Sequence, residues 1–183
     1  RAKFFRKELT EFFILTRDQK LDPVSLTGSY AGAMGYGQFI PSSYRAYAVD
    51  FDGDNFKDIW NNKADAIGSV ANYFSRHGWQ GDGPVIVRGY KTSHNLDVTA
   101  NESLEPKFLA GDLRKKGIRN NLADKTKVAL FEMQGERGQE YWLGLSDFYV
   151  ITRYNRSSMY ALAVFQLSQA IKQERIDLLN SLN

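Results

Sequence analysis

Hydrophobic and polar residues follow two different periods along this chain, helical near both ends and strand-like in the middle. Near the start, Phe5, Leu9 and Phe12 recur at helical spacing with Lys and Arg between them. This pattern predicts a helix over residues 2–19. The helix should end before Pro23, because proline disfavours helical backbone in the residue that precedes it.

Three more helices are expected outside the middle of the chain. A proline at position 41 fits the first turn of a helix, so residues 41–47 should be helical. Asp65 can cap a helix that ends at the glycine stop of Gly78. An amphipathic pattern over residues 157–179 predicts a final long helix. The apolar face of the helix after Asp65 should carry Ile67, Val70, Ala71 and Phe74.

The middle of the chain has the composition of strands. Residues 84–88, 127–133 and 141–143, with a continuation at 148–152, are rich in β-branched and aromatic side chains and are divided by Gly, Asn and charged segments. A short helix is expected within residues 106–117. The chain is therefore expected to have an α+β fold, mostly helical with a small antiparallel β subdomain.

This pattern also predicts the domain boundaries. A helical core should span residues 1–79 and include an acidic loop at 50–65. The small β subdomain should span 80–150, and the segment 151–183 should return to the core as a helix. An N-terminal part of the parent protein is expected to be absent, because the chain starts at Arg1, without Met, already inside a helical pattern.

Composition narrows the classes of function. The 183 residues are 43% hydrophobic, enough for a real core, and no run approaches the ~20 consecutive apolar residues of a membrane helix. The absence of cysteine excludes disulfides, cysteine-type zinc sites and thiol nucleophiles. The net charge of +3 is spread along the chain, so no nucleic-acid partner is expected.

The acidic loop has the spacing of an EF-hand calcium loop. Its oxygen ligands would alternate along the chain, since alternate residues of such a loop point inward. Position 6 is Asn55 rather than Gly, and position 12 is Asn61 rather than a bidentate carboxylate. Asp65 could close the shell instead, or the segment could be a solvated acidic turn with Asp65 as a helix cap. The residues at positions 1, 3, 5, 7 and 9 are Asp50, Asp52, Asp54, Phe56 and Asp58.

The segment before this loop, residues 28–43, is rich in glycine. Its glycines allow a flat ligand to approach the backbone. Ser29 and Gln38 add short hydrogen-bonding groups, and Tyr30 and Tyr36 add stacking faces. This combination suits a sugar, although a tight structural loop would have a similar composition. It lacks the Gly-Lys-Ser/Thr ending of a phosphate loop.

Three ordered segments resemble the lytic murein transglycosylase B family. They read SYAGAMGYGQFIPSSYRAYAVDFDGD, DAIGSVANYFSRHGW and FYVITRYNRSSMYALAVFQL. The resemblance is strong over about the first 80 residues and the last 35, and weak between them. It implies a lysozyme-like helical core with an EF-hand-like Ca²⁺ loop and a small β subdomain. It also implies non-hydrolytic cleavage of peptidoglycan between N-acetylmuramic acid (MurNAc) and N-acetylglucosamine (GlcNAc), giving 1,6-anhydromuramoyl products.

The resemblance also implies roles for individual residues. The metal ligands would be Asp50, Asp52, Asp54, the Phe56 carbonyl and Asp65. The residues that line the glycan groove would be Arg1, Ser29, Gln38, Tyr73, Tyr154, Asn155 and Tyr160. Considered from the residues alone, Tyr73 could equally be a core tyrosine, and the pair Tyr154 and Tyr160 could serve packing or capping.

The family's reaction needs one glutamate, which protonates the glycosidic oxygen and then deprotonates the C6 hydroxyl of MurNAc. In the family this glutamate lies upstream of the residue that matches Arg1, so this chain is expected to hold no catalytic acid. Glu8 and Glu11 are expected on the solvated face of the first helix. A non-catalytic peptidoglycan-binding module and a hydrolytic muramidase are the alternatives.

The resemblance further implies where the protein acts and with what. Its partner would be the glycan strands of peptidoglycan in the periplasm. Contact with a membrane is expected only through an upstream lipid anchor, as in an outer-membrane lipoprotein. A monomer is expected.

Overall fold

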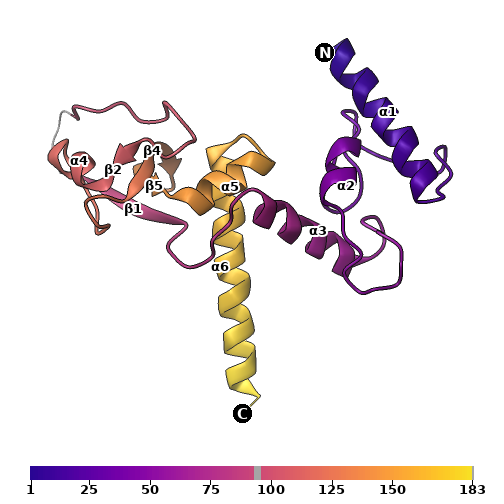
Figure 1. Cartoon of the computed structure of the whole chain (residues 1–183). Helices are drawn as coiled ribbons and strands as arrows, with labels where there is room; N and C mark the ends of the chain where they lie inside the picture. The colour runs from indigo at the N-terminus through magenta and orange to yellow at the C-terminus, as the bar shows by residue number, and fades with distance from the viewer. Residues whose placement is uncertain (93–95, 183) are drawn as a thin grey trace. The chain divides into compact units, whose positions relative to one another are not determined.

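The computed structural model describes residues 1–92 and 96–182 (Figure 1). The chain divides into two compact units, Arg1–Arg76 and His77–Asn183, which we describe one at a time. Over the described residues the fold is α+β, with six helices and one five-stranded sheet. The expected fold class is confirmed.

The first unit contains three helices: α1 (Ala2–Asp18), α2 (Pro41–Tyr47) and α3 (Lys63–Arg76). All three were predicted within a few residues. Proline occupies the first turn of α2, where its missing N–H leaves no hydrogen bond unmade. The small core of this unit consists of apolar side chains from the helices and from the loops between them. Its most buried members are Leu15, Met34, Phe39, Tyr44 and Ile59.

The predicted apolar face of α3 is wrong. Ile67 is 70% exposed, whereas Ser69 and Asp65 are fully buried. These polar side chains are buried because they accept hydrogen bonds from the loop before the helix, including Val49 N–H to Ser69 Oγ at 3.0 Å. The predicted cap is also wrong, since Asn62 Oδ1 accepts the N–H of Ala64 at 2.9 Å and Asp65 lies inside the first turn.

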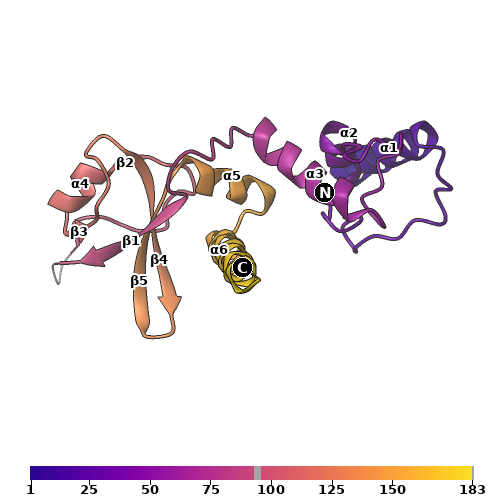
Figure 2. The same ribbon diagram turned by 90° about the horizontal axis from the view of Figure 1, so that it is seen from below.

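The second unit is built on an antiparallel sheet, and Figure 2 shows its long β4–β5 hairpin. The strand order is β2-β4-β5-β1-β3, and helix α4 (Ala110–Lys115) joins β2 to β3. The three predicted runs are confirmed as strands, and the predicted helix within 106–117 is confirmed in shorter form. The strands are β1 (Ile86–Lys91), β2 (Phe108–Leu109), β3 (Ile118–Arg119), β4 (Lys127–Gly135) and β5 (Gly138–Gly144).

The prediction of β structure at 148–152 is wrong, because these residues belong to helix α5 (Ser146–Tyr154). Tertiary contacts override the β propensity of this run. Phe148 is fully buried with its ring centroid 5.3 Å from that of Phe131. The carboxylate of Asp147 in the first turn accepts the N–H groups of Gln80 and Gly81 at 2.9 and 2.8 Å.

The last helix, α6 (Ser158–Ser181), is confirmed. Ser157 caps it, since its Oγ accepts the N–H of Tyr160 at 3.2 Å. Ala161 and Leu162 are buried, while side chains further along, such as Ile171, are exposed. The return of residues 151–183 to the helical core stays a prediction. Over the described residues, no helix combines the length and the apolar character that crossing a membrane requires.

Candidate functional site

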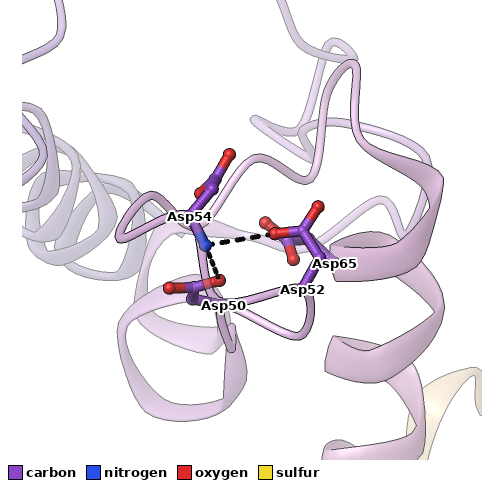
Figure 3. Close-up of side chains that lie close together, drawn as sticks. All are labelled: Asp50, Asp52, Asp54 and Asp65. Atoms are coloured by element: carbon purple, nitrogen blue, oxygen red, sulfur yellow. Dashed lines mark hydrogen bonds between the residues drawn. The ribbon is translucent and has the colours of Figure 1, made fainter.

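Four aspartates converge where the loop after α2 meets α3 (Figure 3). One carboxylate oxygen from each of Asp50, Asp52, Asp54 and Asp65 lies within 4.8 Å of the others. Asp65 is fully buried, whereas Asp52 and Asp54 are exposed. Four negative groups this close repel one another unless a cation lies among them, and hard oxygen donors of this kind suit Ca²⁺.

Backbone hydrogen bonds hold the loop in the shape that brings these carboxylates together. Asp50 accepts the N–H of Gly53 at 2.7 Å and that of Asn55 at 2.8 Å. Gly53 and Asn55 have φ angles of 83° and 71°, so the loop turns twice through left-handed backbone. Asparagine tolerates this conformation better than most residues. The departure from glycine at position 6 therefore does not prevent the turn.

Asp65 connects the two ends of the loop to α3. Its Oδ1 accepts the N–H of Phe51 at 2.7 Å, and its Oδ2 accepts that of Asp58 at 2.8 Å. The side chain of Asp58 is engaged elsewhere, because its Oδ1 accepts the N–H groups of Trp60 and Asn61 at 2.9 and 2.8 Å. Of the two aspartates that could complete the shell, Asp65 is the one in the cluster. The ligand role of the Phe56 carbonyl stays a prediction.

A buried tyrosine supports the same loop from α2. The hydroxyl of Tyr44 donates to the carbonyl of Lys57 at 2.8 Å, and its ring lies 5.5 Å from that of Trp60. Burial raises the pKa of Tyr44, and the negative charges of Asp58 and Asp65 raise it further. The phenol is therefore neutral at physiological pH and serves as a hydrogen-bond donor.

The glycine-rich segment folds back on itself before α2. Ser29 Oγ accepts the N–H of Ala33 at 3.1 Å, and Gln38 Nε2 donates to the carbonyl of Gly35 at 2.9 Å. Gly35 has a φ of 64°, and a Cβ there would lie 2.4 Å from the carbonyl oxygen of Ile59. Only glycine permits this close approach.

Two hollows meet at Gly28 in this segment. One has a volume of about 320 Å³ and is lined by Ser29 together with apolar side chains of α1. The other has a volume of about 420 Å³ and is lined by Gln38, Tyr36 and Trp60. Tyr30 is fully exposed and Tyr36 is largely exposed, so both rings offer free faces. Ser29 and Gln38 thus line adjoining surfaces of one unit, and their role in binding a glycan stays a prediction.

The expected position of Glu8 is wrong. Its side chain lines the first hollow, is only 6% exposed, and accepts the N–H of Ser42 at 2.9 Å, at the start of α2. The signal was present in the sequence, because Glu8 lies three residues after Phe5 and four before Phe12, on their face of the helix. Glu11 is partly exposed and forms an ion pair with Arg45.

The remaining predicted groove residues differ in exposure. Tyr73 is buried in α3, with its ring centroid 4.8 Å from that of Tyr47. Arg1 is exposed and immediately precedes α1. In the second unit, Tyr154 ends α5, exposed Asn155 follows it, and Tyr160, 38% exposed, lies in the first turn of α6. Their role in binding stays a prediction.

Comparisons with known proteins agree on one family. Residues 1–169 match the family described as the transglycosylase SLT domain. The chain is 42% identical over 186 aligned positions to membrane-bound lytic murein transglycosylase B of Escherichia coli (strain K12), covering 96% of this chain and 48% of that protein. The chain thus spans about half the length of this relative.

Solved structures show the same similarity. The soluble lytic transglycosylase SltB1 from Pseudomonas aeruginosa is 53% identical with a TM-score of 0.91, covering 96% of this chain and 59% of that one. The Escherichia coli transglycosylase Slt35 in complex with calcium is 43% identical with a TM-score of 0.87, over 96% and 55%. SltB3 from Pseudomonas aeruginosa in complex with NAG-anhNAM-pentapeptide is 33% identical with a TM-score of 0.81, over 94% and 47%.

Proposed function

Because the chain belongs to the transglycosylase SLT domain family, we propose that it forms the glycan groove of a lytic murein transglycosylase. The parent enzyme cleaves the β-1,4 bond between MurNAc and GlcNAc and leaves a 1,6-anhydromuramoyl end. The observation that carries this proposal is the family match over residues 1–169, together with the pair of adjoining hollows that Ser29 and Gln38 line.

Groove roles follow from the chemistry of the exposed groups. Sugars present hydroxyls to polar side chains and apolar faces to aromatic rings. The exposed rings of Tyr30 and Tyr36 and the short polar side chains beside them offer both kinds of contact. From the resemblance to the family, rather than from exposure in the case of the buried Tyr73, we assign substrate contacts to Arg1, Ser29, Gln38, Tyr73, Tyr154, Asn155 and Tyr160.

The reaction requires one carboxyl group that serves first as general acid and then as general base. The substrate's own C6 hydroxyl is the nucleophile, so no second carboxylate and no water are needed. Glu8 is engaged by the N–H of Ser42 and Glu11 by Arg45. We therefore assign structural roles to these two glutamates and place the catalytic glutamate in a segment of the parent protein that precedes Arg1.

Calcium has a structural role in this proposal. Asp50, Asp52, Asp54, Asp65 and the carbonyl of Phe56 would hold Ca²⁺ and so fix the loop between α2 and α3. The convergence of the four carboxylates supports this assignment, and the related Slt35 has been crystallised in complex with calcium.

Partner, location and domains complete the proposal. The related SltB3 binds a NAG-anhNAM-pentapeptide, which makes peptidoglycan strands the partner expected for this chain. The protein would act in the periplasm as a monomer, with any membrane contact made through an upstream lipid anchor. We assign three domains to the chain. They are a lysozyme-like core over 1–79, a β subdomain over 80–150 and a helix over 151–183 that returns to the core.

The test uses purified peptidoglycan sacculi and the 183-residue chain. We expect the chain to sediment with sacculi and to release no soluble muropeptides, whereas the longer parent protein releases anhydromuropeptides. Mass spectrometry separates these products from those of a muramidase, because the anhydro sugar is one water lighter.

Three outcomes would contradict the proposal. Failure of the chain to sediment with sacculi would refute the glycan groove. Release of anhydromuropeptides by the chain, lost in Glu8→Gln and retained in Glu11→Gln, would place the acid at Glu8. Binding without release by the longer protein as well would favour a non-catalytic peptidoglycan-binding module.

A further inference from the structure

The C-terminal half of α6 carries an exposed apolar stripe. In Figure 1 this part of the helix extends past α5 and the sheet of the same unit. Every residue over 166–182 is exposed. The family match ends at residue 169, so most of the stripe lies beyond the residues that the match covers. The side chains of the stripe are Leu167, Ile171, Leu178 and Leu182, which are 61%, 62%, 60% and 74% exposed.

The four side chains lie on one side of the helix. Leu167 and Ile171 are four residues apart, as are Leu178 and Leu182, so the members of each pair lie one above the other. Ile171 and Leu178 are seven residues apart, which is the heptad spacing of helices that pack in pairs. At a rise of 1.5 Å per residue, the stripe is about 22 Å long. We call these four residues, with Glu174 and Arg175 between them, the α6 seam.

The middle of the α6 seam carries one acidic and one basic side chain. Glu174 and Arg175 are both exposed, and within residues 1–92 and 96–182 neither side chain makes a hydrogen bond or an ion pair. Consecutive residues of a helix point about 100° apart, so these two side chains do not face each other. Each can therefore pair with a charged group on another molecule.

We propose that the α6 seam pairs two copies of this chain as antiparallel helices. A twofold axis through the middle of the seam would place Leu167 against the partner's Leu182. The same axis would place Ile171 against the partner's Leu178. A twofold contact repeats each of these pairs, so four apolar pairs would form. The apolar positions of the seam are thus complementary to themselves in this orientation.

The charged side chains favour the same orientation. The twofold axis that pairs the apolar residues also places Glu174 against the partner's Arg175, and Arg175 against the partner's Glu174. Two ion pairs would therefore form at the centre of the contact. In a parallel pair each residue faces its own copy, so two Glu174 side chains would meet and repel each other.

The charge of the segment argues against a membrane as its partner. Over residues 167–182 two basic side chains, Lys172 and Arg175, balance two acidic ones, Glu174 and Asp177. A helix that binds an anionic membrane surface carries an excess of Lys and Arg on its polar face. A second copy of the chain, which supplies both charges, fits the α6 seam better.

A contact of this size would form a weak dimer. Stable interfaces bury at least about 1,200 Å² in total, and eight apolar side chains contribute less, so we expect dissociation constants in the micromolar range or weaker. The chain would be a monomer when dilute, as in the proposed function, and would pair where its local concentration is high. This pairing goes beyond the proposed function and does not depend on it.

The test is sedimentation equilibrium of the 183-residue chain and of the longer parent protein, from about 1 μM to about 1 mM. We expect Glu174→Arg to weaken association about tenfold, because each ion pair becomes a contact between two arginines. Arg175→Glu should have a similar effect. The double variant that combines both changes should restore association, since it only exchanges the members of each ion pair.

A second pair of variants tests the apolar side chains. Ile171→Gln should weaken association at least tenfold, because it places an amide among the apolar pairs. Ile176→Gln is the matched control, because position 176 is five residues further on and so points about 140° away from Ile171. This control should change nothing. Circular dichroism should report the same helix content in all of these variants.

Three outcomes would overturn the inference. The wild-type chain could stay monomeric at every concentration, or Glu174→Arg could associate as well as the wild type; in both cases the α6 seam does not pair. Association of the 183-residue chain without association of the parent protein would show that another part of the parent covers the stripe. Each of these results leaves the proposed function standing, because sedimentation with sacculi tests the groove and not the seam.

Discussion

The most direct test of the metal loop is Asp65→Asn. This change keeps the shape of the side chain but removes one negative charge and turns one oxygen into a donor. Both oxygens of Asp65 accept backbone N–H groups, from Phe51 and Asp58, so one of these contacts becomes a clash between donors. Because the side chain is fully buried, water cannot take over the lost bond.

The size of the effect follows from linkage between metal binding and folding. Calcium at about 100 times its dissociation constant stabilises the folded state by about 2.7 kcal/mol. At roughly 2–4 °C per kcal/mol for a chain of this length, the melting temperature should rise by about 5–10 °C. Loss of one carboxylate ligand that lowers affinity tenfold would remove about 1.4 kcal/mol of that stabilisation.

Scanning calorimetry in excess calcium and in excess chelator measures both quantities. The wild type should melt at higher temperature with calcium, and this shift should shrink in Asp65→Asn. The matched control is Asp58→Asn, the same chemical change in the same loop, at a side chain that contacts Trp60 and Asn61 instead of the cluster. An undiminished calcium shift in Asp65→Asn, or a shift lost only in Asp58→Asn, would refute the assignment.

Two further substitutions test the neighbouring contacts. Gly35→Ala should lower the free energy of unfolding by more than about 2 kcal/mol in urea titrations, because its Cβ would meet the Ile59 carbonyl. The control is Gly32→Ala, where a Cβ meets nothing within 4 Å. It should lower the free energy of unfolding by only about 1 kcal/mol. Equal losses would show that backbone strain alone matters. Since burial first, and then nearby carboxylates, raise the pKa of Tyr44 above its unfolded value near 10, the folded state binds more protons there. The contribution of Tyr44 to the free energy of unfolding is present below pH ~10 and lost above it. Alkaline titration should therefore show a smaller loss of stability in Tyr44→Phe than in the wild type. Identical slopes of stability against pH in the two proteins would contradict this reasoning.

Helices at both ends and strands in the middle could be predicted because each follows from a local period in the sequence. The exception at 148–152 shows the limit of that signal. Phe148, Val150 and Ile151 favour a strand locally, yet all three are buried in α5. The hydrogen bonds of Asp147 to Gln80 and Gly81 join positions more than 60 residues apart, and no local pattern reports them.

The candidate site shows the same division between local patterns, which could be predicted, and contacts between distant positions, which could not. The aspartates of the loop could be predicted because their alternation lies within a few residues, and only their closure by Asp65 required the fold. The spacing of Glu8 from Phe5 and Phe12 could have placed it on the apolar face, but its hydrogen-bond partner could not be predicted, because Ser42 lies 34 residues away. The buried face of α3 was missed since Ser69 and Asp65 are polar, and only their contacts with the preceding loop make their burial favourable.

The metal loop and the glycine-rich segment form one connected structure in the first unit. Asp65 fixes the N–H of Asp58, and the next residue, Ile59, accepts the N–H of Tyr36 at 2.9 Å. Gly35 packs against the same Ile59 carbonyl and accepts the side chain of Gln38. An ion that holds Asp65 in place therefore also fixes the backbone that orients Gln38. If calcium binds as proposed, its loss should loosen the proposed groove before it unfolds the helices, because that groove would depend on this chain of contacts while α1 and α2 also pack on each other.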